Sequence, residues 1–274
     1  MKPVQNLHTH SIYCDGKNTP KELIEKAISL GFKSIGFSGH GYTPFILTYC
    51  MDEIKTSEYI AEINKLKQEY KGKIQVFLGI EYDLYSKGSL TPYDYVIGSV
   101  HYLKDINGNF FSVDIKSSQS LISVINEKFN GNAMALCKAY YETISNLKRY
   151  LDRVDIVGHF DLITKSNDEY RVIDTECEEY REYATKAIKK LVKDVGVFEI
   201  NTGAVARGIK KEPYPDKWLL TEIFKQGGKI VITSDCHDKE YLNFYFDKAV
   251  QLAKECGFTE IYYFKGKGFE PFAI

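Results

Sequence analysis

Short apolar runs alternate along the chain with longer segments whose apolar residues recur at helical spacing. The short runs are rich in Val and Ile and end at polar residues, as strands buried on both faces do. They cover residues 4–10, 34–40, 74–82, 94–101, 154–159, 197–203, 229–235 and 261–264. Each of these runs is therefore predicted to form a β-strand.

Segments with helical periodicity separate most of the predicted strands. They cover residues 21–31, 51–72, 135–154, 178–196, 216–228 and 243–257. The first has clear ends, because Thr19 can cap it, Pro20 suits its first position and Gly31 follows its last turn. Strand followed by helix, repeated about seven times, predicts an α/β fold with a parallel sheet.

Two α/β architectures fit this alternation, an open doubly wound sheet and a closed barrel. No Gly-x-Gly-x-x-Gly or Walker A motif follows any predicted strand, and polar residues end nearly all of them. In a barrel these ends converge on one face, whereas in an open sheet they are strung along an edge. We therefore predict a TIM-like (β/α) barrel of about seven units with its site at the C-terminal face of the strands.

One stretch, residues 102–131, interrupts the alternation between a predicted strand and the next helix. It is long for a connection, and long insertions after barrel strands often act as lids. A surface loop that contains one short helix explains this segment equally well. Since no linker or repeat divides the chain, we predict a single domain over residues 1–274, with a lid insertion at 102–131 as one interpretation.

All six histidines lie in short polar motifs, mostly at the ends of predicted strands: His8, His10, His40, His101, His159 and His237. His8 and His10 alternate along one strand, so their side chains share a side. On its own, a pair of histidines at this spacing is more often part of the protein core than of a metal site. Neutral imidazole is the commonest side-chain ligand of transition metals, so six converging histidines indicate a metal site.

Carboxylates accompany these histidines. Asp15 follows the first pair in a turn-like sequence, Glu81 ends a buried strand, and Asp235 precedes His237 by two residues. A buried carboxylate is costly unless it is paired or bound to a metal. Six imidazoles and three carboxylates suit three divalent ions, with carboxylates bridging. The mixed nitrogen and oxygen donors favour Zn²⁺, Mn²⁺ or Fe²⁺ over Ca²⁺ or Mg²⁺.

Composition narrows the function further. The net charge of −1 argues against a broad nucleic-acid surface, so we expect a small-molecule substrate and no nucleic-acid partner. No apolar run could cross a membrane, and no apolar signal region precedes His8. The six cysteines show no CxxC spacing and are expected to be reduced thiols. We therefore expect a cytoplasmic protein, and the sequence does not indicate an oligomeric state.

The ordered motifs HTHSIYCDG, SGHG, GIEY, GSVH, GHFD and TSDCH resemble those of the PHP (polymerase and histidinol phosphatase) superfamily. GSVHYL and EINTGAVARGIKKEPYP look most like its histidinol-phosphate phosphatases, enzymes of histidine biosynthesis. The resemblance implies a distorted (β/α)₇ barrel and a trinuclear metal centre. It implies the ligands His8, His10, Asp15, His40, Glu81, His101, His159, Asp235 and His237. It also implies three groups, one of His8, His10, Glu81 and Asp235, one of Glu81, His101 and His159, and one of Asp15, His40 and His237.

The resemblance implies hydrolysis of a phosphate monoester, by in-line attack of a hydroxide that bridges two metals. Arg207 is our candidate for binding the phosphate, because its planar guanidinium can donate hydrogen bonds to two oxygens at once. Lys165 is a weaker candidate, as are Lys210 and Lys211. Asp161 is proposed either to protonate the leaving group or to hold His159. The leaving group would meet Tyr42, Phe111 and Asp114.

Other functions remain open from the sequence. Related barrels include phosphodiesterases or nucleases and phosphotyrosine phosphatases. A metal-binding regulatory barrel without activity is a further alternative, although its ligand set would not need to be complete.

Overall fold

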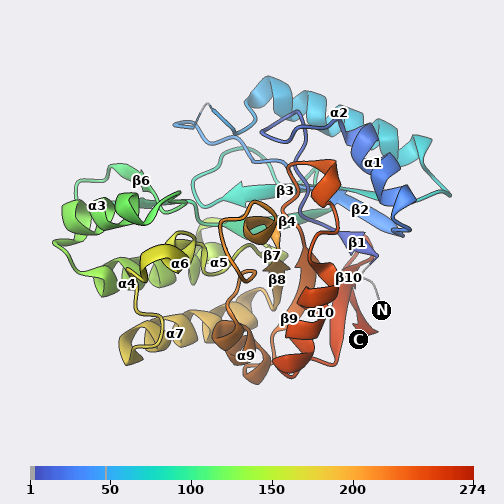
Figure 1. Ribbon diagram of the computed structural model, residues 1–274. Coiled ribbons are helices and arrows are strands. Elements are labelled where there is room, and N and C mark those ends of the chain that lie inside the picture. The colour runs from blue at the N-terminus through green and yellow to red at the C-terminus, as the bar shows by residue number, and fades with distance from the viewer. Residues whose placement is uncertain (1–3, 47) are drawn as a thin grey trace.

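Seven parallel strands form the centre of the computed structural model, which describes residues 4–46 and 48–274 (Figure 1). In spatial order they are β1 (Gln5–Asn6), β2 (Ser34–Phe37), β3 (Gln75–Asp83), β4 (Tyr95–Ser99), β7 (Ile156–Val157), β8 (Val197–Asn201) and β9 (Lys229–Thr233). Every neighbouring pair is parallel. The order of the strands in space follows the chain, as in a barrel built from repeated strand and helix units.

The first and last strands of this sheet meet just beyond their C-terminal ends. His10 N donates to Cys236 O at 2.8 Å, and Cys236 N donates to His8 O at 3.0 Å. Thr9 and Cys236 thereby form a parallel bridge between the two edges. The sheet is a nearly closed seven-stranded barrel, so the predicted (β/α)₇ TIM-like architecture is confirmed.

Helices surround the strands, with α1 and α2 on one side in Figure 1 and α9 and α10 on another. Outside residues 102–131, the longer helices are α1 (Pro20–Ser29), α2 (Glu53–Glu69), α4 (Ala133–Ile144), α7 (Glu178–Asp194), α9 (Lys217–Lys225) and α10 (Phe246–Glu255). Thr19 caps α1 and exchanges hydrogen bonds with Glu22 in a capping box, so this start is as predicted. No helix among the described residues is long and apolar enough to cross a membrane.

The prediction of a single helix over residues 135–154 is wrong, because the segment divides into α4 and a short α5 (Leu147–Tyr150). The side chains of Ser145 and Asn146 both donate to Glu142 O, at 2.9 and 2.6 Å. Such local bonds compete with the helical ladder. Further short elements are α6 (Asn167–Tyr170), α8 (Gly203–Ala206), η1 (Leu162–Thr164) and η2 (Lys239–Tyr241).

The predicted strand at 261–264 lies outside the barrel. It is β10 (Glu260–Phe264), which pairs antiparallel with β11 (Phe269–Ala273). Phe264 packs with Phe77 and Tyr95 in the cluster of side chains inside the barrel. Gln5 holds it there, since its amide accepts from Phe264 N at 2.8 Å and donates to Phe264 O at 3.0 Å. The hairpin therefore closes the end of the barrel opposite the histidines.

Residues 102–131 form a hairpin of β5 (Tyr102–Lys104) and β6 (Phe110–Ser112), followed by α3 (Ser118–Phe129). Side-chain hydrogen bonds attach this segment to residues that follow β7. Ser118 donates to Ser166 O at 2.5 Å, and Ser166 donates to Ile115 O at 2.7 Å. Its role as a lid stays a prediction.

Candidate metal centre and substrate cavity

Glu81, near the C-terminal end of β3, is the centre of the site. Its side chain is buried, and imidazole nitrogens surround both carboxylate oxygens. The nitrogens lie 2.8 to 3.5 Å from these oxygens and belong to His8, His10, His40, His101 and His159. Ser99, on the neighbouring strand β4, donates to Oε1 at 2.8 Å. Separate strands thus deliver five imidazoles to one carboxylate.

The structure brings all nine predicted ligands to this end of the barrel. Three overlapping groups have donor atoms within 4.8 Å of one another: His8, His10 and Glu81; Glu81, His101 and His159; and His10, Asp15, His40 and His237. Asp235 Oδ1 lies 3.2 Å from His10 Nε2 and 3.7 Å from His8 Nε2, beside the first group. The groups follow the predicted partition with two differences: Asp235 lies beside the first group and is not part of it, and His10 also belongs to the third.

Unpartnered atoms show whether these residues fit metal ions. His8 Nε2, His10 Nε2 and Glu81 Oε2 are buried and have no hydrogen-bond partner in the described part of the chain. Buried polar atoms are normally paired, and the two nitrogens lie 3.3 and 3.5 Å from Glu81 Oε2. Divalent ions would take up these lone pairs, and nitrogen mixed with carboxylate oxygen suits zinc and its neighbours. The described residues therefore contain groups able to bind metal ions.

The charges at this site favour ionised carboxylates. Burial alone would raise the pKa of Glu81, but His40, His8 and His101 hold that pKa well below its usual value. Burial likewise opposes ionisation of Asp235, whose pKa Arg207 and His8 nevertheless lower. The negative charge that metal ions require is thus present at neutral pH.

Glu199 on β8 belongs to the site although the sequence interpretation missed it. Its fully buried Oε2 lies 2.8 Å from His8 Nδ1, and its Oε1 accepts from His159 N at 2.7 Å. A carboxylate on Nδ1 of His8 directs the lone pair of Nε2 toward the candidate metal position. The same reasoning that selected Glu81, a carboxylate in a buried strand, could have found it.

Asp83, two residues beyond Glu81, supports His101 in the same way and was also missed. Its Oδ2 accepts from His101 N at 2.7 Å and lies 3.3 Å from His101 Nδ1. Burial lowers the pKa of His101, but Glu81 and Asp83 more than compensate and raise it to about 9. Without bound metal, His101 is therefore charged at neutral pH.

Asp235 adopts an uncommon backbone conformation, with φ of 44° in the left-handed region. Non-glycine residues in this region are strained, and such strain gathers at functional sites. Gly203 makes room for the residue, because a Cβ there would lie 2.7 Å from the Cβ of Asp235. Arg207 completes the arrangement, donating to Asp235 Oδ2 at 3.0 Å and to Asp235 O at 3.2 Å.

A cavity of about 820 Å³ opens over the metal groups. Its wall includes Arg207, Lys165 and Asp114, which the sequence suggested as substrate contacts. Lys165 forms an ion pair with Asp114, so the two charges offset each other. The remaining lining residues include Tyr49, Tyr102, Ser112, Lys116 and Tyr214, none of which was predicted. The insertion at 102–131 thus supplies one wall of the cavity.

Several predicted substrate contacts do not line this cavity. Phe111 packs against Phe129 within the insertion, with ring centroids 5.9 Å apart. Two other tyrosines, Tyr49 and Tyr102, line the cavity, and their hydroxyls lie 3.1 Å apart. Lys210, Lys211 and Tyr42 are likewise absent from the lining. Loop side chains are positioned by tertiary contacts, which sequence spacing does not specify.

Asp161 is fully buried and is not among the residues that line the cavity. Its Oδ2 accepts from Asp216 N at 3.2 Å and from Thr164 Oγ1 at 3.3 Å. Burial and the nearby charge of Asp216 raise the pKa of Asp161. These contacts support neither of the two roles suggested from the sequence, proton donation to substrate or support of His159.

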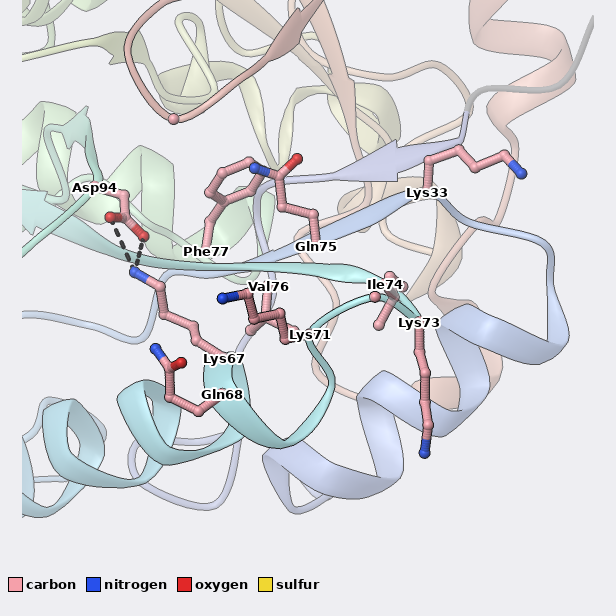
Figure 2. A pocket seen from close by; sticks show the side chains of 12 residues that line it. Lys33, Lys67, Gln68, Lys71, Lys73, Ile74, Gln75, Val76, Phe77 and Asp94 are labelled. Carbon is pink, nitrogen blue, oxygen red and sulfur yellow. Dashed lines mark hydrogen bonds and ion pairs between the residues drawn. The ribbon is translucent and has the colours of Figure 1, made fainter.

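A second cavity, of about 560 Å³, lies near the N-terminal ends of β2 and β3 and is lined by lysines. Figure 2 shows Lys67 turned to Asp94, which it pairs with at 2.7 Å, while Lys33 and Lys73 point in different directions. The charges do not converge on a common point, so this cavity lacks the features of a binding site.

Comparisons with known proteins agree with this geometry. The model of the PHP domain family matches residues 6–203. A probable histidinol-phosphatase from Schizosaccharomyces pombe is 28% identical over 93% of this chain and 87% of its own. Histidinol-phosphatase from Lactococcus lactis is 27% identical over 95% of this chain and 94% of its own.

A solved structure shows the same fold. Histidinol phosphate phosphatase from Lactococcus lactis, crystallised with zinc, L-histidinol and phosphate, superposes with a TM-score of 0.69. It is 24% identical to this chain, with 97% of this chain and 98% of that one covered. The family model covers most of the barrel and the motifs from His8 to His159. The chain belongs to the PHP domain family.

Proposed function

We propose that this protein is a metal-dependent phosphate monoester hydrolase, a histidinol-phosphate phosphatase that converts L-histidinol phosphate and water to L-histidinol and phosphate. The observation that carries the proposal is the set of three overlapping histidine and carboxylate groups at the floor of a cavity that Arg207 also lines. Similarity over nearly the whole chain to curated histidinol-phosphatases supports the choice of substrate.

Three divalent ions would be held at the floor of the cavity. The first would take His8, His10, Glu81 and Asp235, the second Glu81, His101 and His159, and the third Asp15, His40 and His237. Glu81 would be shared, since both its oxygens face imidazoles. Bound ions of this kind polarise phosphate oxygens and activate water near neutral pH. Zinc is the first ion to test, because a related protein was crystallised with it; Mn²⁺ and Fe²⁺ are the alternatives.

Arg207 is proposed to bind the phosphate group. Its guanidinium is anchored to Asp235 beside the first metal group, and about a third of its side chain is exposed toward solvent. The planar guanidinium can offer its remaining N–H groups to two phosphate oxygens at once. A phosphate monoester carries up to two negative charges at pH 7, so Arg207 and the ions together offset that charge.

Asp114 is proposed to receive the positively charged amine of the leaving group. Its carboxylate lines the cavity and remains about a third exposed even though Lys165 pairs with it. The rings of Tyr49 and Tyr102, which also line the cavity, offer flat apolar surface for an imidazole. An amine and an imidazole are the groups that distinguish histidinol phosphate from simpler phosphate esters.

The test is kcat/KM for histidinol phosphate, phosphotyrosine and a dinucleotide, measured with Zn²⁺, Mn²⁺ and Fe²⁺ separately. We expect histidinol phosphate to be preferred by at least ~100-fold, as for a site that pairs buried polar groups of its substrate. Preference for phosphotyrosine or the dinucleotide would replace this function with one of the alternatives. No hydrolysis by fully metallated protein would instead support a regulatory barrel.

A further inference from the structure

Tyr214 is a buried residue in the wall of the substrate cavity, and its hydroxyl has no hydrogen-bond partner among the described residues. Glu81 and His159 are the other residues of this wall that carry such a buried, unpartnered atom in the described part of the chain. Both of these residues are already proposed as metal ligands. Because buried polar groups are normally paired, the hydroxyl of Tyr214 points to a partner that is not part of the chain.

The backbone of Tyr214 is fixed at the mouth of the barrel. Tyr214 N donates to Asn201 O at 3.0 Å, and Asn201 N donates to Tyr214 O at 2.7 Å, at the C-terminal end of β8. A residue on an irregular segment is thereby attached to one of the barrel strands. Groups that act on a substrate need this kind of rigid support.

The ring of Tyr214 is also held in place. It meets the ring of His159 edge to face, with centroids 6.3 Å apart and planes at 68°. The ammonium of Lys210 lies over it, 5.3 Å from the ring centroid. Neither contact uses the hydroxyl. The ring is therefore positioned by its faces and edges, which leaves the hydroxyl free to interact with a ligand.

We infer that the hydroxyl of Tyr214 donates a hydrogen bond to an oxygen of the bound phosphate monoester. The inference rests on the proposed function. A phenol keeps its proton at neutral pH and so acts as a donor. Arg207, Glu81 and His159 lie in the same wall, where the metal ions would gather the anionic part of the substrate. Phosphate oxygens accept hydrogen bonds, whereas the amine of the leaving group only donates them.

The substitution Tyr214→Phe removes one oxygen atom and keeps the ring. In the metal-loaded protein we expect kcat/KM to fall about 10- to 100-fold, the effect of one hydrogen bond to a charged group. The dissociation constant of inorganic phosphate, measured by calorimetry, should rise by a similar factor. Metal content should be unchanged, and the thermal midpoint should be equal or higher because an unpartnered buried hydroxyl is removed.

Tyr140→Phe is the matched control. Tyr140 is also buried with an unpartnered hydroxyl, but it does not line the cavity. This variant should bind phosphate and turn over substrate within twofold of the wild type. Comparable losses in both variants, loss of metal from Tyr214→Phe, or wild-type phosphate binding by Tyr214→Phe would each overturn the inference.

The proposed function and the role of Tyr214 can be refuted independently of each other. If the wild type hydrolyses another phosphate monoester in preference to histidinol phosphate, the proposed function is wrong. The inorganic phosphate titration of Tyr214→Phe still decides the role of Tyr214, because it does not depend on the leaving group.

Discussion

Glu199 allows a sharp prediction, because four donors converge on its buried carboxylate. Oε2 faces His8 Nδ1 at 2.8 Å and Thr233 Oγ1 at 2.9 Å. Oε1 faces His159 N at 2.7 Å and Asn201 Nδ2 at 2.8 Å. Replacing Glu199 with Gln changes one of these oxygens into an amide NH₂ group without altering the shape of the side chain.

The position of that NH₂ group is determined by its neighbours. The backbone N–H of His159 can only donate, so the NH₂ group must face His8 and Thr233 instead. His8 Nδ1 must then accept a hydrogen bond, which places the imidazole proton on Nε2. That atom lies 3.3 Å from Glu81 and is the one proposed to bind the first metal ion. A protonated nitrogen has no lone pair for a metal.

Glu199→Gln should therefore weaken binding of one metal ion about 10- to 100-fold, the usual cost of losing a group that orients a histidine ligand. This corresponds to about 1.4 to 2.8 kcal/mol. The assay is a zinc titration in competition with a chromophoric chelator, with bound metal counted by mass spectrometry. Thr233→Val is the control, because it removes a donor to the same oxygen without changing the proton on His8. It should cost about 1 kcal/mol of stability and leave zinc affinity within threefold.

Equal zinc affinity and stoichiometry in Glu199→Gln and the wild type would refute the proposed orientation of His8. Equal losses in the two variants would refute it as well, since the effect would then arise from general damage to β8 and β9.

Further predictions concern pH, Asp161 and Arg207. Glu81 and Asp83 outweigh the effect of burial and raise the pKa of His101 to about 9. The charged form of His101 therefore stabilises the metal-free protein below pH 6.5. This contribution to stability is lost as the pH rises through about 9. The thermal midpoint of metal-free protein should fall over this range, while that of metal-loaded protein should rise because protons compete with ions; a fall in both would contradict the account. Asp161→Asn should keep kcat/KM within threefold and raise the thermal midpoint at pH 8, because burial disfavours the charge of Asp161; a 100-fold loss of activity would restore it as a proton donor. Arg207→Gln should lower kcat/KM about 100-fold, mainly through KM, with metal content retained; loss of metal would instead show that Arg207 acts by holding Asp235.

The barrel and the convergence of the nine candidate ligands followed from the sequence because two simple signals agreed. Buried strands alternated with helices, and each histidine lay in a short polar motif. In a parallel barrel such motifs share one face, so no knowledge of the distances was needed to bring His8 of the first strand to Asp235 of the last. In the structure, His8 Nε2 lies 3.7 Å from Asp235 Oδ1.

Residues that orient the ligands were harder to predict. Glu199 lies in an apolar run and Asp83 directly follows one, and nothing in their spacing shows which histidine each one contacts. The cavity wall was harder still, because Tyr49, Tyr102 and Tyr214 come from loops and hairpins. The break between α4 and α5 depends on side-chain hydrogen bonds of Ser145 and Asn146, which compete locally with a pattern that otherwise favours one helix.

The central claim is that the histidines and carboxylates at the mouth of the barrel hold a cluster of divalent ions. Anomalous diffraction at the zinc absorption edge, from crystals grown with Zn²⁺, tests it directly. We expect three peaks, one each near His8, His101 and Asp15, and the peaks near His8 and His101 should share Glu81. The absence of any peak within bonding distance of Glu81 would contradict the account and remove the basis for phosphatase activity.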